Sequence, residues 1–302
     1  MATRGSIATS EQMGTSEPPL ITIVGPTASG KTALAIELAK KFHGEIICGD
    51  SRTVYQDMDI GTAKPSREER EAVPHWGLDL VEPGQYFTVA DFKRYADKKI
   101  HEIHTRGHVP FLVGGTGLYI DAVLFDYHFS PKADPTIRRQ LENLTIEQLQ
   151  QYCIRNNVTL PENNTNKRHL VRTIERNGMN SQRQSTPIYN TVIVGIATDK
   201  TTLRNRIEAR TEHLFDAGVV EEAIMLGKKY GWESEAMTGN IYPLLHQYLD
   251  GTLTLDEVKR RFVTLDWRLA KRQLTWLRRN EFIQWLNLTD AKSYLSSVLS
   301  EH

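Results

Sequence analysis

Eight residues near the start of the chain have the types and spacing of a phosphate-binding loop. The segment GPTASGKT consists of Gly25, Pro26, Thr27, Ala28, Ser29, Gly30, Lys31 and Thr32. Its glycines let successive backbone N–H groups turn toward one concavity, where an anion supplies the missing acceptors. Lys31 can bring its charge to a terminal phosphate, and the hydroxyl of Thr32 is the predicted metal ligand, for Mg²⁺. An ordinary Gly/Ser turn is the alternative, and the loop alone does not identify ATP.

Two further motifs follow apolar runs of the kind that form buried strands. Asp50 ends the run EIICGD, where it can hold Mg²⁺ or accept a proton from a nucleophile; a turn or helix-cap aspartate is the alternative. GGTGLY, residues 114–119, presents the hydroxyl and N–H of Thr116, although short glycine motifs also form plain turns. The segment DIGTAKP, residues 59–65, is a predicted loop that carries Lys64; solvated surface is the alternative, and composition assigns it no chemistry.

Basic residues concentrate in one predicted helix near the C-terminus. The stretch 259–279 holds eight Lys or Arg residues and one acid, Asp266, with Trp267 and Trp276 among them. Such a helix suits a nucleic-acid phosphate backbone, with aromatic and guanidinium planes for unstacked bases. A merely solvated basic face is the alternative.

Two arginine pairs have the spacing of one helix face. Arg168 and Arg172 are four residues apart, and so are Arg206 and Arg210. A guanidinium matches two phosphate oxygens, so these pairs are candidates for binding a diphosphate.

Composition limits the class of protein. The chain of 302 residues can bury a large core, and its 37 Lys and Arg balance 37 Asp and Glu, so net charge predicts no partner. The two cysteines provide no disulfide framework and no four-thiolate zinc site, and no apolar run is long enough to span a membrane. Residues 1–19 lack an apolar signal core. We therefore expect a disordered tail on a cytoplasmic protein.

Apolar runs alternate with helical patterns in the first half of the chain. LITIV, EIICGD, VPFLVGG and TVIVGIA are typical of buried parallel strands, whereas residues 33–40 and 89–107 have helical patterns. This alternation predicts an α/β fold, a parallel sheet flanked by helices, with ligands beyond the carboxyl ends of the strands. We predict a catalytic core of residues 20–128 and 167–302, its C-terminal part helical, and a small helical insertion domain at 129–166.

Taken in order, these motifs resemble those of the tRNA dimethylallyltransferases, also called isopentenyl-tRNA transferases. The resemblance covers roughly residues 20–285. The matching segments are GPTASGKT, GDSRTVYQDMDIGTAKP, VADF, GGTGLY, ADPTIR, NKRHLVRTIE, RIEARTEHLFDAGVVEEA and RLAKRQLTWLR. Three positions depart from the pattern: Thr53 replaces a glutamine, Trp76 replaces a histidine, and the segment 237–245 matches only loosely.

The resemblance implies a P-loop-type core and transfer of a dimethylallyl group from dimethylallyl diphosphate to the exocyclic amine of the adenine 3′ to the anticodon. The loop would hold the diphosphate leaving group with Mg²⁺, and no ATP need be consumed. Asp50 matches the general base, Thr116 matches the residue that hydrogen-bonds the flipped adenine, and Arg210 matches an arginine that stabilises the departing charge.

The same resemblance implies a monomer whose insertion domain grips the tRNA anticodon stem-loop. The candidate tRNA contacts are Asp50, Ser51, Arg52, Thr53, Thr116, Arg138, Arg168, Arg172, Lys271, Arg272, Gln273 and Arg278. A small-molecule kinase that uses the loop for ATP is the main alternative, and a non-catalytic tRNA-binding protein is another. Only the kinase would need ATP, and only the non-catalytic protein would show no turnover.

Overall fold

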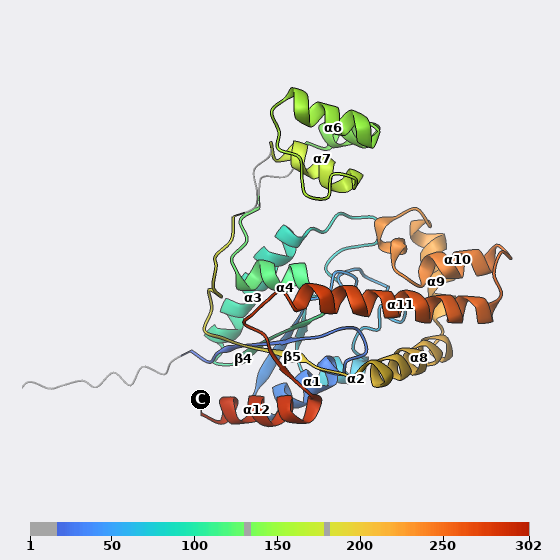
Figure 1. Ribbon diagram of the computed structural model, residues 1–302. Helices are drawn as coiled ribbons and strands as arrows, with labels where there is room; N and C mark the ends of the chain where they lie inside the picture. The colour runs from blue at the N-terminus through green and yellow to red at the C-terminus, as the bar shows by residue number, and fades with distance from the viewer. Residues whose placement is uncertain (1–16, 130–133, 178–181, 302) are drawn as a thin grey trace, which may run out of the picture. The chain divides into compact units, whose positions relative to one another are not determined.

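The computed structural model describes residues 17–129, 134–177 and 182–301. The chain divides into two compact units (Figure 1): Met1–Ile120 with Tyr189–His302, and Asp121–Ile188. Of the predicted disordered tail, residues 1–16 lie outside the described residues. None of the helices in the described ranges is long and apolar enough to cross a membrane.

The first unit is built on a six-stranded sheet in which every paired neighbour is parallel. The strands are β1 (Leu20–Val24), β2 (Gly44–Cys48), β3 (His75–Trp76), β4 (Val109–Gly114), β5 (Thr191–Ile196) and β6 (Gln284–Leu286). Their order is β3-β2-β4-β1-β5-β6. The four predicted strands and the α/β fold class are confirmed. The sequence did not reveal β3 and β6, because two or three residues are too short to show periodicity.

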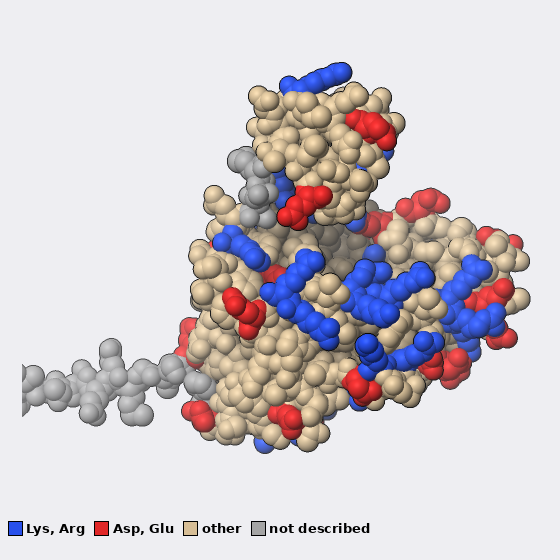
Figure 2. Space-filling model, viewed as in Figure 1, with Lys and Arg blue, Asp and Glu red and all other residues tan. Residues whose placement is uncertain are grey.

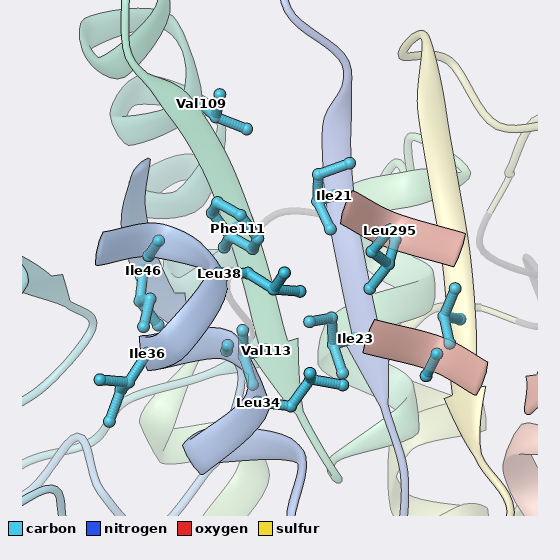
Figure 3. Close-up of a cluster of buried hydrophobic side chains, with 14 of the residues drawn as sticks. Ile21, Ile23, Leu34, Ile36, Leu38, Ile46, Val109, Phe111, Val113 and Leu295 are labelled. Atoms are coloured by element: carbon cyan, nitrogen blue, oxygen red, sulfur yellow. The ribbon is translucent and has the colours of Figure 1, made fainter. Parts of the chain in front are cut away.

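Burial explains why β1, β2 and β4 lie in the middle of the sheet. All their residues are buried, which fits strands covered on both faces. On one face Ile21 and Ile23 of β1 pack with Leu38 of α1 (Lys31–Lys41) and Leu295 of α12 (Leu288–Ser300), as Figure 3 shows. On the opposite face, α3 (Val89–Thr105) packs against β2 and β4 (Figure 1).

The remaining helices of this unit form most of its C-terminal part. They are α8 (Lys200–Asp216), α9 (Val219–Tyr230), η1 (Glu235–Thr238), α10 (Tyr242–Leu249) and α11 (Leu255–Leu277), whereas α2 (Arg67–Ala72) lies earlier in the chain, between β2 and β3. The capping box of Thr254 and Glu257 starts α11, and α11 packs on α8 through Leu203, Ile207 and Ala270. The predicted helical C-terminal part is thus observed, with β6 as an interruption.

The second unit is helical and has a core of its own. It contains α5 (Pro135–Glu142), α6 (Ile146–Arg155) and α7 (Lys167–Glu175), while α4 (Gly117–Leu124) runs across the boundary between the units. Leu170 and Ile174 of α7 join Leu149 and Cys153 of α6 in this core. The unit therefore extends beyond the predicted insertion, 129–166, because α7 completes its core. Residues 130–133 of that prediction lie outside the described residues.

Candidate active site

Three neighbouring strands end at the same edge of the sheet, and each leads into one of the predicted motifs. The phosphate loop follows β1, Thr116 follows β4, and Asp50 follows β2, in adjacent positions of the strand order. The Ser51 N–H donates to the Thr116 hydroxyl at 3.2 Å, and the Thr116 N–H donates to the Gly49 carbonyl at 3.4 Å. The structure thus brings Asp50 and Thr116 together at the edge where parallel sheets bind ligands.

The phosphate loop passes directly into α1. Gly30 has a φ of 90°, which lies in the left-handed region that favours glycine, and no side chain caps the helix start. The unpaired N–H groups of this first turn are therefore available to an anion. The hydroxyl of Ser29 is buried and has no hydrogen-bond partner among the described residues.

Lys31 lies within a dense group of charges. Its ammonium donates to the carbonyl of Pro26 at 3.2 Å. Loss of hydration around this ammonium lowers the pKa of Lys31 to about 8; Asp50 raises that pKa and Arg210 lowers it further. Both groups therefore lie close enough to Lys31 to act on its charge.

Helix α8 contributes both members of a predicted arginine pair to this loop. Arg206 donates to the Ser29 carbonyl at 3.0 Å. Arg210 donates to the hydroxyl of Thr27 and, at 3.1 Å, to the carboxylate of Asp266 on α11. The prediction that these two arginines share a helix face beside a phosphate site agrees with this geometry, because both guanidinium groups contact the loop.

Gln273 of α11, one of the predicted tRNA contacts, also hydrogen-bonds the phosphate loop, a contact that sequence reasoning missed. Its side-chain oxygen accepts the N–H of Thr27 at 2.8 Å. A Cβ at Gly115 would lie 2.5 Å from the Gln273 amide nitrogen and 3.0 Å from the Gly25 carbonyl, so a side chain here would displace the Gln273 amide from its present position. The GG pair of the GGTGLY motif could have signalled such a close contact, but nothing in the sequence named its partner.

Asp50, Arg52 and Thr53 differ in their hydrogen-bond partners and in their exposure to solvent. One carboxylate oxygen of Asp50 accepts the N–H of Arg52 at 2.8 Å. The guanidinium of Arg52 donates to the carbonyl of Glu235 and to the hydroxyl of Thr238, and so holds this loop to η1. Thr53 is only 7% exposed, so its predicted contact with tRNA would require the loop to move.

The alternative that DIGTAKP is solvated surface does not hold for Lys64, although Asp59 and Ala63 of this segment are exposed. The ammonium of Lys64 is fully buried and donates to the Tyr55 carbonyl and to the carboxylates of Asp59 and Asp79. A buried cation requires such partners, and these fix the course of the loop after β2.

Glu222 of α9 also holds this loop in place through hydrogen bonds. Its buried carboxylate accepts the N–H groups of Asp59, Ile60 and Gly61 and the hydroxyl of Tyr242. The motif therefore has a structural role that its composition did not reveal.

The basic side chains of the stretch 259–279 lie on the exposed face of α11 and, for Arg278 and Arg279, just past its end. Figure 2 shows Lys and Arg side chains gathered on this face. Lys271, Arg272 and Arg278 are exposed, and the ammonium of Lys271 lies 5.2 Å from the Trp267 ring centroid. The predicted stripe exists, but its acid, Asp266, is buried and takes no part in the surface.

The second unit contains the other predicted tRNA contacts. Arg138 of α5 makes two parallel hydrogen bonds, both 2.7 Å, to the carboxylate of Glu175. Arg168 and Arg172 are exposed on α7. Neighbouring side chains remove part of the hydration of the Arg172 guanidinium and, together with the charges of Arg168, Arg176 and Arg138, lower its pKa, so positive charge gathers around this residue.

The oxygen ligands for Mg²⁺ are few but suitable. The described residues contain no group of three or more His, Cys, Asp or Glu side chains placed to hold a metal. Mg²⁺ at phosphate sites usually takes only one or two protein oxygens, with waters and phosphates completing its shell. The Thr32 hydroxyl, in the first turn of α1 next to Lys31, is an oxygen of this kind.

Family models agree with this geometry. The IPP transferase model matches residues 53–280, and the isopentenyl transferase model matches residues 18–79. The chain belongs to the IPP transferase family.

Individual relatives of this IPP transferase match over nearly its whole length. The tRNA dimethylallyltransferase of Geobacillus kaustophilus is 39% identical over 91% of this chain and 92% of its own, and that of Bacillus velezensis is 36% identical over 92% and 93%. The crystal structure of a tRNA isopentenylpyrophosphate transferase from Bacillus halodurans superposes with a TM-score of 0.71. It is 34% identical and covers 94% of this chain and 97% of its own. The predicted family and the predicted enzyme class, a prenyltransferase, are confirmed.

Proposed function

We propose that this IPP transferase moves a dimethylallyl group from dimethylallyl diphosphate to the exocyclic amine of the adenine 3′ to the anticodon in tRNA. One observation carries the proposal: the phosphate loop with Lys31 and Arg210 lies at the same sheet edge as Asp50 and Thr116. A site for a leaving diphosphate thus lies beside a carboxylate that can take a proton. The names of the relatives, which specify tRNA and a dimethylallyl group, support the choice of substrates.

The reaction exchanges one bond for another. The bond between the first prenyl carbon and the diphosphate oxygen breaks, its electron pair stays with the diphosphate, and the adenine nitrogen forms a bond to that carbon. Because the carbon is allylic, positive charge develops there while negative charge grows on the diphosphate. Lys31, Arg210 and the first-turn N–H groups of α1 meet that growing charge.

Asp50 removes the proton that the attacking amine must lose. Its Oδ1 accepts the N–H of Arg52, which orients the carboxylate and leaves Oδ2 to face the amine. In this proposal the hydroxyl of Thr116, which accepts the Ser51 N–H, hydrogen-bonds the flipped base. Mg²⁺, held by the Thr32 hydroxyl and the donor's phosphate oxygens, would supply further positive charge at the leaving group. Action as a monomer and a cytoplasmic location belong to the same proposal.

Incubation with labelled dimethylallyl diphosphate and an anticodon stem-loop RNA tests the proposal. Nucleoside analysis should recover the label on the adenine next to the anticodon. A matched stem-loop with guanine at that position is the control and should stay unlabelled. Absence of label from the adenine-containing RNA would refute the proposal.

A further inference from the structure

The acid within the basic stretch of α11 is buried against the active-site arginine. Asp266 is 3% exposed. One of its carboxylate oxygens accepts from Nη1 of Arg210 at 3.1 Å, and the other accepts from the side-chain amide of Asn240 at 2.9 Å. Asn240 lies between η1 and α10, so three separate elements meet at this carboxylate.

The hydrogen bonds of Arg210 hold one nitrogen of its guanidinium and leave the other two nitrogens free to donate. The same nitrogen, Nη1, also donates to the hydroxyl of Thr27 in the phosphate loop. Among the described residues, Nε and Nη2 of Arg210 have no hydrogen-bond partner. The guanidinium is therefore anchored on the loop with two donors still available to an anion, the arrangement that a bidentate phosphate contact needs.

The carboxylate also balances positive charge around the phosphate loop. Arg210 lies close enough to Lys31 to lower its pKa, so two cationic side chains converge before any diphosphate arrives. Asp266 offsets one of them without contacting the loop itself. Replacing it with a neutral group would leave the loop more positive but Arg210 less well oriented.

We propose that Asp266, itself oriented by Asn240, is a positioning residue that holds Arg210 against Thr27 so that the guanidinium meets the departing diphosphate. The proposal rests on the proposed function, because Arg210 must act on a leaving diphosphate for its orientation to matter. Orientation counts most in the transition state, where charge on the diphosphate is largest. Removing the carboxylate should therefore affect the rate more than the binding.

The substitution Asp266→Asn tests this with a side chain of the same shape. Single-turnover prenyl transfer to the stem-loop should slow by about 10- to 100-fold, since one misaligned electrostatic donor costs about 10² to 10³ when removed altogether. Affinity for inorganic pyrophosphate should change by less than about threefold or become tighter. Asp256→Asn, an exposed acid in the first turn of the same helix, is the matched control and should leave both quantities unchanged.

A double-mutant cycle with Arg210→Gln separates positioning from a general structural role. If Asp266 acts through Arg210, adding Asp266→Asn to the Arg210→Gln variant should slow transfer no further. Fully additive losses, unchanged transfer in a folded Asp266→Asn variant, or parallel loss of transfer and pyrophosphate affinity would overturn the proposal. If the wild-type chain itself transfers no prenyl group, the proposed function fails instead.

Discussion

The charge balance at the phosphate loop is set by single side chains. The ammonium of Lys31 is shielded from water and lies near the positive charge of Arg210. Both effects disfavour its protonated form, and the negative charge of Asp50 offsets only part of them. A diphosphate supplies the missing negative charge. Binding of the donor and protonation of Lys31 are therefore coupled, and this coupling is measurable.

The pKa of Lys31 predicts a pH dependence of donor capture. Lys31 is protonated below about pH 8 in the free enzyme and loses its charge above it, so kcat/KM for dimethylallyl diphosphate should fall as the pH rises through about 8. Because Asp50 raises this pKa and Arg210 lowers it, Arg210→Gln should move the descending limb to higher pH. A pH profile of pyrophosphate affinity gives the same information without turnover. A flat profile between pH 7 and 9 would contradict the assignment.

The role of Asp50 as base predicts a selective loss of rate. In Asp50→Ala, single-turnover prenyl transfer should fall by about two to four orders of magnitude, the usual contribution of general-base catalysis. Affinity for the stem-loop, measured by filter binding, should fall much less. Asp216→Ala, an exposed acid at the end of α8, is the control. Near-native transfer by the Asp50 variant would exclude that role.

Among the helices, α11 contributes to the site through two different faces. Its inner face places Gln273 and Asp266 against the phosphate loop and Arg210. Its outer face presents Lys271, Arg272 and Arg278 to solvent beside that site. One helix can therefore orient the diphosphate site and attract an RNA backbone at the same time.

The outer face predicts salt-dependent binding of tRNA. Changing Lys271 and Arg278 to Gln should weaken stem-loop binding and reduce the slope of log affinity against log salt by up to about 0.7 to 0.9 per lost phosphate contact. Pyrophosphate affinity should be nearly unchanged. The matched control removes two charges from the far end of the same helix, Arg260 and Arg261. Equal slopes for the wild type and the Lys271/Arg278 variant would show that this face is only solvated.

The loop after β2 depends on a buried carboxylate from a different element. In Glu222→Gln, one oxygen acceptor becomes a donor that faces the N–H groups of residues 59–61, so at least one buried group loses its partner. The free energy of unfolding, from urea titration, should fall by about 1.5–3 kcal/mol. Glu221→Gln, the exposed neighbour, should change it by less than about 0.5 kcal/mol. A stable Glu222 variant would refute this account of the loop.

At the scale of the whole molecule, the parallel sheet made much of the site predictable. Asp50, Thr116 and the phosphate loop each end an apolar strand, and parallel strands place their carboxyl ends on one edge. Gln273 and Asp266 could not be predicted in their observed roles, because their contacts come from the packing of α11 on α8 and leave no local pattern. The predicted insertion ended at residue 166 and so left out α7. The packing of α7 against α6 in the core of the second unit leaves no local pattern in the sequence.

We propose that the phosphate loop holds the diphosphate leaving group of a prenyl donor, whereas a kinase would bind ATP there. The loop's backbone N–H groups, Lys31 and Thr32 would bind the phosphates and Mg²⁺ of either ligand, so the loop cannot distinguish the two by its own residues. The stoichiometry of the reaction distinguishes them directly.

The decisive measurement follows prenyl transfer to the stem-loop in a mixture from which ATP has been removed enzymatically, with released pyrophosphate quantified beside the prenylated nucleoside. We expect one pyrophosphate per prenyl group transferred, and the same rate when ATP is added back, with no ADP formed. In Lys31→Ala, transfer should be abolished, because the leaving group loses its nearest charge. A requirement for ATP, or ADP formed in proportion to product, would contradict the account.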